Sequence, residues 1–167
     1  MRVVTDLPHR VRELENVWVP VPGTDERMAA RIWMPEEASP HHPVPAILEY
    51  IPYRKRDFTA PRSGPLHRYF AGHGYASVRL DLRGSGESDG LMTDEYLAQE
   101  LEDGKAAIAW LAAPPGCSAA GRTLAHPCAR PNSLHGAALR PPALKAIITS
   151  CSTDDRYEDD IHYKGGR

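Results

Sequence analysis

The chain has 167 residues, of which 41% are hydrophobic and 25% charged, and its 20 basic residues nearly balance its 22 acidic ones. This composition is typical of one ordinary globular domain, and without a Lys/Arg block we expect no nucleic-acid partner. No run of about 18 apolar residues occurs, and the first residues lack the apolar core of a signal peptide, so we expect no membrane partner and a cytoplasmic location.

The first half of the chain predicts a hairpin and two further strands. Residues 11–21 alternate in hydrophobicity up to a Pro-Gly turn, and residues 28–34 follow as the antiparallel partner, stopped by Pro35. Residues 44–51 are a nearly continuous apolar run, which is the pattern of a strand covered on both faces, and residues 75–80 predict another strand.

Two helices and a last strand complete the predicted order. Residues 66–72 predict a short amphipathic helix, and residues 94–113 predict a longer one with acidic residues in its first turns, where the helix dipole favours negative charge. Residues 144–149 predict a buried strand. This order predicts the α/β class, in which a β-hairpin is followed by a mainly parallel sheet with flanking helices. The apolar face of the longer helix comprises Leu97, Leu101, Ile108 and Leu111.

Six short motifs lie along this framework: Val17-Trp18-Val19-Pro20, Tyr50-Ile51-Pro52-Tyr53-Arg54-Lys55, Gly74-Tyr75, residues 81–90, Trp110-Leu111 and Leu144-Lys145-Ala146-Ile147. In this order the set resembles the amino-terminal part of the CocE/NonD and X-Pro dipeptidyl-peptidase (S15) hydrolases. The resemblance covers about residues 11–118 and 132–166.

The resemblance implies an α/β-hydrolase fold and a Ser-Asp-His triad that cleaves carboxylic esters, amides or X-Pro peptides. The expected partner of the intact protein is therefore a small ester, amide or peptide substrate, and neither a metal nor an organic cofactor is implied. The nucleophile of such an enzyme sits on a G-x-S-x-G turn between a strand and a helix. Tyr53 matches the family tyrosine that donates its hydroxyl to the oxyanion.

The nucleophile turn is missing from the interval where the family has it. By alignment of the flanking motifs, Pro127 stands where the serine belongs, and proline has neither a nucleophilic atom nor a backbone N–H. Residues 119–131 are also a poor buried strand, because Arg122, His126 and two prolines interrupt them. Our hypothesis is that this disrupted nucleophile segment arose from two compensating frameshifts, which the coding DNA would show.

The end of the sequence leads to a second expectation about completeness. Only 40 residues follow Pro127, too few for the remaining strands, a cap domain, an Asp and a His. We therefore expect residues 1–167 to form an incomplete α/β-hydrolase domain, residues 150–167 to begin a connection toward a missing cap domain, and the chain itself to be inactive. Oligomeric state is left open by the sequence.

The glycine-rich residues 81–90 offer a rival interpretation as a phosphate-binding loop of a nucleotide-binding α/β domain. The spacing lacks the full dinucleotide pattern, and no P-loop Lys-Ser/Thr follows. We favour a structural turn in which Asp81 and Arg83 bond to nearby backbone. A third interpretation is a non-enzymatic remnant or interaction module that binds a partner through exposed strand edges.

Two further groups of residues carry chemically reactive side chains but do not fit a catalytic or metal site. Cys128 lies beside the position of the missing nucleophile, but nothing in its Pro- and Arg-rich surroundings supplies a positioned base. The spacings of the nearby Cys and His residues match no standard zinc site. An acidic segment follows the last strand too closely to hold the family's Asp and His, so we interpret it as a solvated loop. These groups comprise Cys117, His126, Cys128 and His135, and Asp154, Asp155, Asp159, Asp160 and His162.

Overall fold

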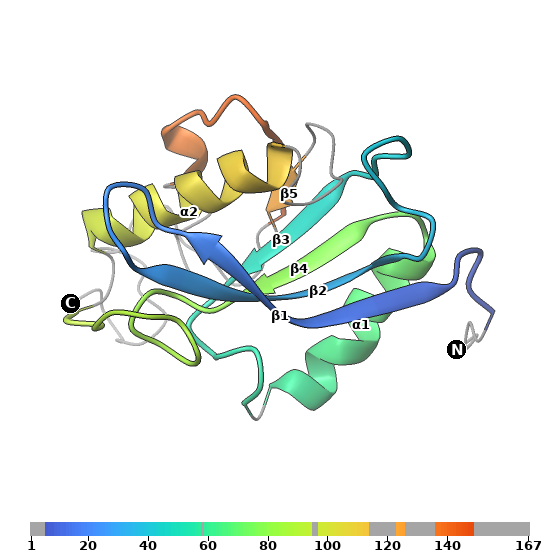
Figure 1. The fold of residues 1–167 in the computed structure, drawn as a ribbon, viewed down its shortest axis with the longest axis horizontal. Helices are drawn as coiled ribbons and strands as arrows, with labels where there is room; N and C mark the ends of the chain where they lie inside the picture. The colour runs from blue at the N-terminus through green and yellow to red at the C-terminus, as the bar shows by residue number, and fades with distance from the viewer. Residues whose placement is uncertain (1–5, 58, 95–96, 114–122, 126–135, 149–167) are drawn as a thin grey trace, which may run out of the picture.

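The computed structural model describes residues 6–57, 59–94, 97–113, 123–125 and 136–148. Within these ranges the chain forms a single sheet flanked by two long helices (Figure 1). The strands are β1 (Val11–Pro20), β2 (Arg27–Pro35), β3 (Ala46–Tyr50), β4 (Ala76–Leu80), β5 (Thr123–Ala125) and β6 (Leu144–Ile147), and the helices are α1 (Ala60–Gly72) and α2 (Ala98–Ala112).

The strand order in the sheet is β1-β2-β4-β3-β5-β6. Strands β1 and β2 form the predicted antiparallel hairpin, and β2 continues antiparallel to β4. The pairs β4–β3, β3–β5 and β5–β6 are all parallel. The prediction of a hairpin leading into a mainly parallel α/β sheet is therefore confirmed.

Strand β5 lies within residues 119–131, the segment that the sequence indicated to be a poor buried strand. Thr123–Ala125 pair with β3 on one side and β6 on the other. A strand of three residues needs only its backbone groups to complete two ladders. Its position in the middle of the parallel strands matters for the site described below.

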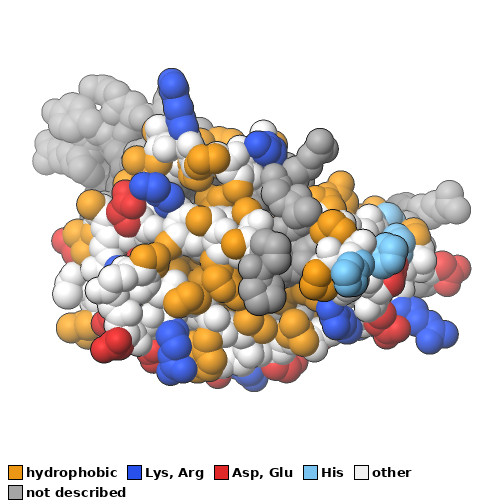
Figure 2. Space-filling model, turned by 45° about the horizontal axis from the view of Figure 1, so that its top comes forward, with side chains coloured by type: hydrophobic (Ala, Val, Ile, Leu, Met, Phe, Trp, Pro, Cys, Tyr) orange, Lys and Arg blue, Asp and Glu red, His pale blue; other side chains and the backbone are white. Residues whose placement is uncertain are grey.

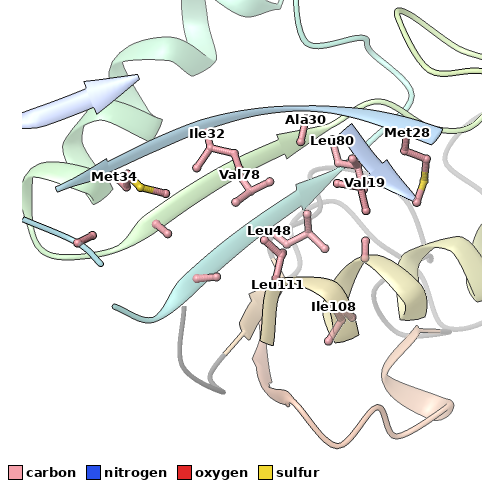
Figure 3. Close-up of a cluster of buried hydrophobic side chains, with 14 of the residues drawn as sticks. Val19, Met28, Ala30, Ile32, Met34, Leu48, Val78, Leu80, Ile108 and Leu111 are labelled. Carbon is pink, nitrogen blue, oxygen red and sulfur yellow. The ribbon is translucent and has the colours of Figure 1, made fainter. Parts of the chain in front are cut away.

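The apolar core lies between one face of the sheet and α2, while α1 covers the other face (Figure 1). Figure 3 shows Leu48 and Val78 from neighbouring strands packed toward Ile108 and Leu111 of α2. Each such aliphatic side chain, when fully buried, stabilises the fold by about 1.5–3 kcal/mol. The predicted apolar face of α2 is thus correct for its C-terminal half.

Both helices begin at residues other than those predicted. Helix α1 begins at Ala60 rather than at residue 66, because Pro61 stands in the first turn, where proline needs no hydrogen-bond partner for its nitrogen. Pro65 lies inside the helix and also obscured its start in the sequence. Helix α2 begins at Ala98 rather than at residue 94, with Leu97 as its N-cap.

The face of the sheet under α1 is polar, unlike the face under α2. His67 of α1 bonds through Nδ1 to Ser77 Oγ at 2.7 Å and through Nε2 to Glu49 Oε2 at 2.9 Å. The ring of Trp33 stacks on the His67 imidazole, with centroids 4.6 Å apart and planes 5° apart. All four residues are buried, so this network packs α1 against the sheet through hydrogen bonds rather than through an apolar layer.

On the side of the molecule that carries α2, hydrophobic side chains gather over the centre of the surface, and Lys, Arg, Asp and Glu lie toward its borders (Figure 2). Leu139 and Ile148, which flank β6, are 40% and 47% exposed. In the described part of the chain, the outer edge of β6 pairs with no further strand.

Candidate active-site edge

The four parallel strands bring their carboxyl ends to one edge of the sheet, which we call the carboxyl edge. Tyr50 pairs with Leu80, and Leu48 pairs with Ala125, so β3, β4 and β5 end close to one another. Two loops leave this edge within the described residues: the Tyr53 loop (51–57) after β3 and the Asp81 loop (81–94) after β4. Ligands of open α/β sheets bind beyond the carboxyl ends of the strands.

The Tyr53 loop turns sharply just after Tyr53. Arg54 has a φ of 50°, a left-handed conformation that is uncommon for a residue with a side chain, and its guanidinium pairs with Asp57 at 2.5 Å. Thr59, which precedes α1, donates its hydroxyl to the Tyr53 carbonyl at 3.5 Å and accepts a hydrogen bond from the buried Arg79. Tyr53 itself is half-buried.

Asp81 joins the two loops through its buried carboxylate. Its Oδ1 accepts a hydrogen bond from the backbone N–H of Lys55 at 2.5 Å, and its Oδ2 accepts one from the N–H of Glu87 at 3.0 Å. Burial raises the pKa of the Asp81 carboxyl, and the hydrogen bond from Lys55 opposes that shift. The expectation that Asp81 bonds to nearby backbone in a structural turn is confirmed.

Arg83 has partners other than those predicted. Instead of backbone carbonyls, its guanidinium binds the Asp103 carboxylate of α2 through two contacts, at 2.9 and 2.7 Å, and Glu26 at 2.9 Å. A planar guanidinium matches a carboxylate with two parallel hydrogen bonds, and these bonds to Asp103 raise the pKa of Arg83. The prediction was wrong because both acids lie far from Arg83 in sequence.

Lys55 is a buried amine that the sequence did not reveal. Its side chain is completely buried, and its ammonium contacts the Glu87 carboxylate, which also binds Arg56 Nε at 2.8 Å. Burial lowers the pKa of Lys55, and the nearby Asp81 opposes this shift. A run of Arg-Lys-Arg after a strand reads as a solvated loop, and only the folded Asp81 loop shows that one of the three is enclosed.

The sequence contains one G-x-S-x-G pattern, at residues 86–90, but it is not at the position of a nucleophile turn. It follows β4 rather than β5. Ser88 Oγ accepts a hydrogen bond from the N–H of Ala29 at 2.9 Å and donates one to the carbonyl of Asp81 at 2.9 Å. The hydroxyl is thus engaged in holding the Asp81 loop against β2.

The same loop uses its backbone donors internally. The N–H of Gly84 bonds to the Asp89 carbonyl at 2.8 Å, the N–H of Ser88 to the Ser85 carbonyl at 3.1 Å, and the N–H of Glu87 to Asp81. A phosphate-binding loop needs such groups to point toward the ligand. The named donors are not available to a phosphate, which removes the support for a nucleotide-binding loop.

Several residues singled out from the sequence lie outside the described residues. They are Pro127, the residues Cys117, His126, Cys128 and His135, and the acidic segment with Asp154, Asp155, Asp159, Asp160 and His162. Among the residues that the structure does describe, no group of three or more His, Cys, Asp or Glu side chains is arranged to hold a metal ion. No helix in the same ranges has the length and apolar character needed to cross a membrane.

Residues 23–167 match the family model of the X-Pro dipeptidyl-peptidase (S15 family). This chain belongs to that family. It is 32% identical over 105 residues to proteins from Mycobacterium bovis and Mycobacterium tuberculosis that are named as serine esterases. The match covers 59% of this chain and 16% of those relatives, so it spans about a sixth of their length.

Solved structures show the same fold for this S15-family chain. An aminopeptidase from a marine sediment archaeon superimposes with a TM-score of 0.65 at 20% identity over 96% of this chain and 28% of its own. An α-amino acid ester hydrolase gives a TM-score of 0.65 at 19% identity, with the same coverage of both chains. The predicted α/β-hydrolase fold is confirmed, and the relatives are hydrolases of the esterase and peptidase type.

Proposed function

We propose that this chain carries part of the catalytic framework of an S15-family serine hydrolase that cleaves carboxylic esters, amides or X-Pro peptides. The observation that carries the proposal is the place of β5, between β3 and β6, with its carboxyl end at the same edge as the Tyr53 loop. In α/β-hydrolases the nucleophile turn follows a strand at this edge, and an oxyanion-hole donor comes from the loop after the third strand.

Tyr53 is the residue to which we assign oxyanion stabilisation. In the intact enzyme, a serine Oγ would attack the substrate carbonyl while a histidine takes the serine proton, and the Tyr53 hydroxyl would donate a hydrogen bond to the resulting oxyanion. Collapse of this intermediate releases the alcohol or amine, which receives the proton, and water then hydrolyses the acyl-enzyme. The anchors at Thr59 and Asp81 support the role, because such a donor is effective only when it is held in place.

We further propose that this polypeptide does not itself turn over substrate. Two residues after β5 the sequence has Pro127, which offers no hydroxyl for acylation. Ser88 does not replace it, because its hydroxyl bonds to Ala29 and Asp81 and no histidine among the described residues contacts it. Treatment with a fluorophosphonate probe, followed by intact mass measurement, is expected to give no adduct. A stoichiometric adduct on a serine would refute this part of the proposal.

The role of Tyr53 is tested in a chimera in which residues 1–118 of this chain replace the matching part of one of the mycobacterial relatives. We expect the chimera to hydrolyse a p-nitrophenyl ester, and Tyr53→Phe to lower kcat by about 10²–10³-fold, the effect of losing one oxyanion donor, with little change in KM. Tyr69→Phe is the matched control, because Tyr69 is 43% exposed on α1. An active chimera in which both variants keep full kcat would exclude Tyr53 from the oxyanion site.

A further inference from the structure

A groove of about 720 Å³ lies between the β1–β2 hairpin and the N-terminal half of α1. It is on the α1 side of the sheet, the side opposite to the core under α2. Its walls include Arg31 and Trp33 from β2, Arg56 from the Tyr53 loop, and Gly64, Pro65 and Arg68 from α1. The volume is within the range of about 300–1,000 Å³ that small-molecule sites have in proteins.

The apolar part of the groove is rigid and open. Trp33 is held by its stacking on His67, and the Arg31 guanidinium lies 4.9 Å from the centre of the Trp33 ring. Apart from Arg68, the helical wall offers only small or cyclic side chains, and a Cβ placed on Gly64 would have no atom within 4 Å. A flat apolar group therefore has space to lie along α1 without any rearrangement of the chain.

The charged part of the groove is made mainly of guanidinium groups. Three of them, from three different elements, line it together with the carboxylates of Glu13 and Asp57. Arg31 pairs with Glu13 and Glu15, and Arg56 pairs with Glu15 and Glu87. Within the described ranges, Arg68 has no carboxylate partner, and it is exposed at the rim of the groove.

We propose that this groove binds a small organic anion, a carboxylate on a flat apolar body, on the α1 face of the sheet. The apolar body lies along α1 over Gly64 and Pro65, and the carboxylate pairs with Arg68. This binding function does not depend on hydrolysis, so it remains when the nucleophile position is occupied by Pro127.

The first test is titration of the chain with 2-naphthoate, with naphthalene-2-carboxamide as the uncharged counterpart. We expect saturable one-to-one binding with a Kd below about 1 mM, shifts of the Trp33 indole signal and the α1 amides in NMR spectra, and at least tenfold weaker binding of the carboxamide. Equal binding of the two compounds, or no saturation by about 10 mM naphthoate, overturns the proposal.

The second test fills the groove without damage to the fold. In Gly64→Leu the new side chain enters open space, and leucine favours a helix more than glycine does. The melting temperature should therefore be equal or higher while naphthoate binding is lost. Unchanged binding in a folded Gly64→Leu protein places the ligand elsewhere and overturns the proposal.

The third test concerns the charge. Arg68→Ala should weaken naphthoate binding about tenfold or more, because it removes a charge-assisted hydrogen bond. Arg62→Ala is the matched control, since Arg62 is exposed on the same helix but does not line the groove. If the two variants bind naphthoate equally, Arg68 is not the anion partner and the proposed site is wrong.

Discussion

The carboxylate of Asp81 accepts the backbone N–H of Lys55 at 2.5 Å, and this bond ties the loop after β4 to the loop that carries Tyr53. The other oxygen of the same carboxylate accepts the N–H of Glu87. One buried side chain therefore fixes both loops of the carboxyl edge that the structure describes. The bond also holds the backbone two residues from the proposed oxyanion donor.

Loss of this carboxylate should loosen both loops. We expect Asp81→Ala to lower the free energy of unfolding by about 2–4 kcal/mol, because the buried N–H of Lys55 and the partly buried N–H of Glu87 lose their acceptor and the enclosed Lys55 ammonium loses a neighbouring charge. Urea denaturation measures the loss, and amide exchange at Lys55 and Glu87 should become faster. Asp25→Ala, at an exposed turn, is the control and should stay within about 0.5 kcal/mol of the parent.

Replacement of Gly86 and of Gly64 by alanine should change the free energy of unfolding in opposite directions. A Cβ on Gly86 would lie 2.2 Å from Asp81 Oδ2, and the residue has a φ of 60°. Gly86→Ala should therefore destabilise the chain by more than about 2 kcal/mol. Gly64→Ala meets no atom and should stabilise by up to about 1 kcal/mol, because alanine favours the helix. Thermal and urea unfolding of the pair give the comparison, and equal effects would contradict the Asp81–Gly86 contact.

Short-range patterns of hydrophobicity in the sequence were enough to predict several of the strands. The alternation along residues 11–21 predicted β1, and the nearly continuous apolar run of residues 44–51 predicted β3, which is buried along most of its length. The start of α1 was missed because Pro61 and Pro65 are usual signals of a loop, although the first is well placed in a first helical turn.

The features that were missed depend on residues far apart in the chain. Strand β5 exists because β3 and β6 supply ladders on both sides of three residues. The partners of Arg83 are 20 and 57 residues away, so no local window contains them. The G-x-S-x-G pattern at residues 86–90 shows the reverse case. Its residues match the motif, but they follow β4, which is not the strand that leads to a nucleophile.

The Arg83–Asp103 pair offers a matched comparison of a buried and an exposed ion pair. Asp103 is 2% exposed, so Asp103→Ala removes the buried partner of Arg83, leaves it only the partly exposed Glu26, and should cost about 1.5–3 kcal/mol. Glu102, its neighbour on α2, pairs with Lys105 in solvent, and Glu102→Ala should cost at most about 0.5 kcal/mol. Urea denaturation of both variants measures the difference, and similar small effects would show that Asp103 does not anchor the Asp81 loop.

Tyr50 provides a prediction for stability and its dependence on pH. Its hydroxyl is buried with no hydrogen-bond partner among the described residues, which costs free energy that phenylalanine does not incur. Tyr50→Phe should therefore raise the free energy of unfolding by about 1 kcal/mol at neutral pH. Tyr69→Phe, at an exposed position of α1, should leave it unchanged.

The pH dependence follows from the direction in which the Tyr50 pKa is shifted. Burial, and then the negative charges of Asp103 and Glu100, raise the pKa of Tyr50 above its ordinary value of 10.0. Above pH 10 the unfolded chain loses the phenol proton while the folded chain keeps it, so the folded state binds more protons and the parent loses stability as pH rises. Tyr50→Phe lacks this loss, and its advantage should grow when urea unfolding is compared at pH 7, 9, 10 and 11. An advantage that stays constant across this series would mean that the Tyr50 phenol is not enclosed.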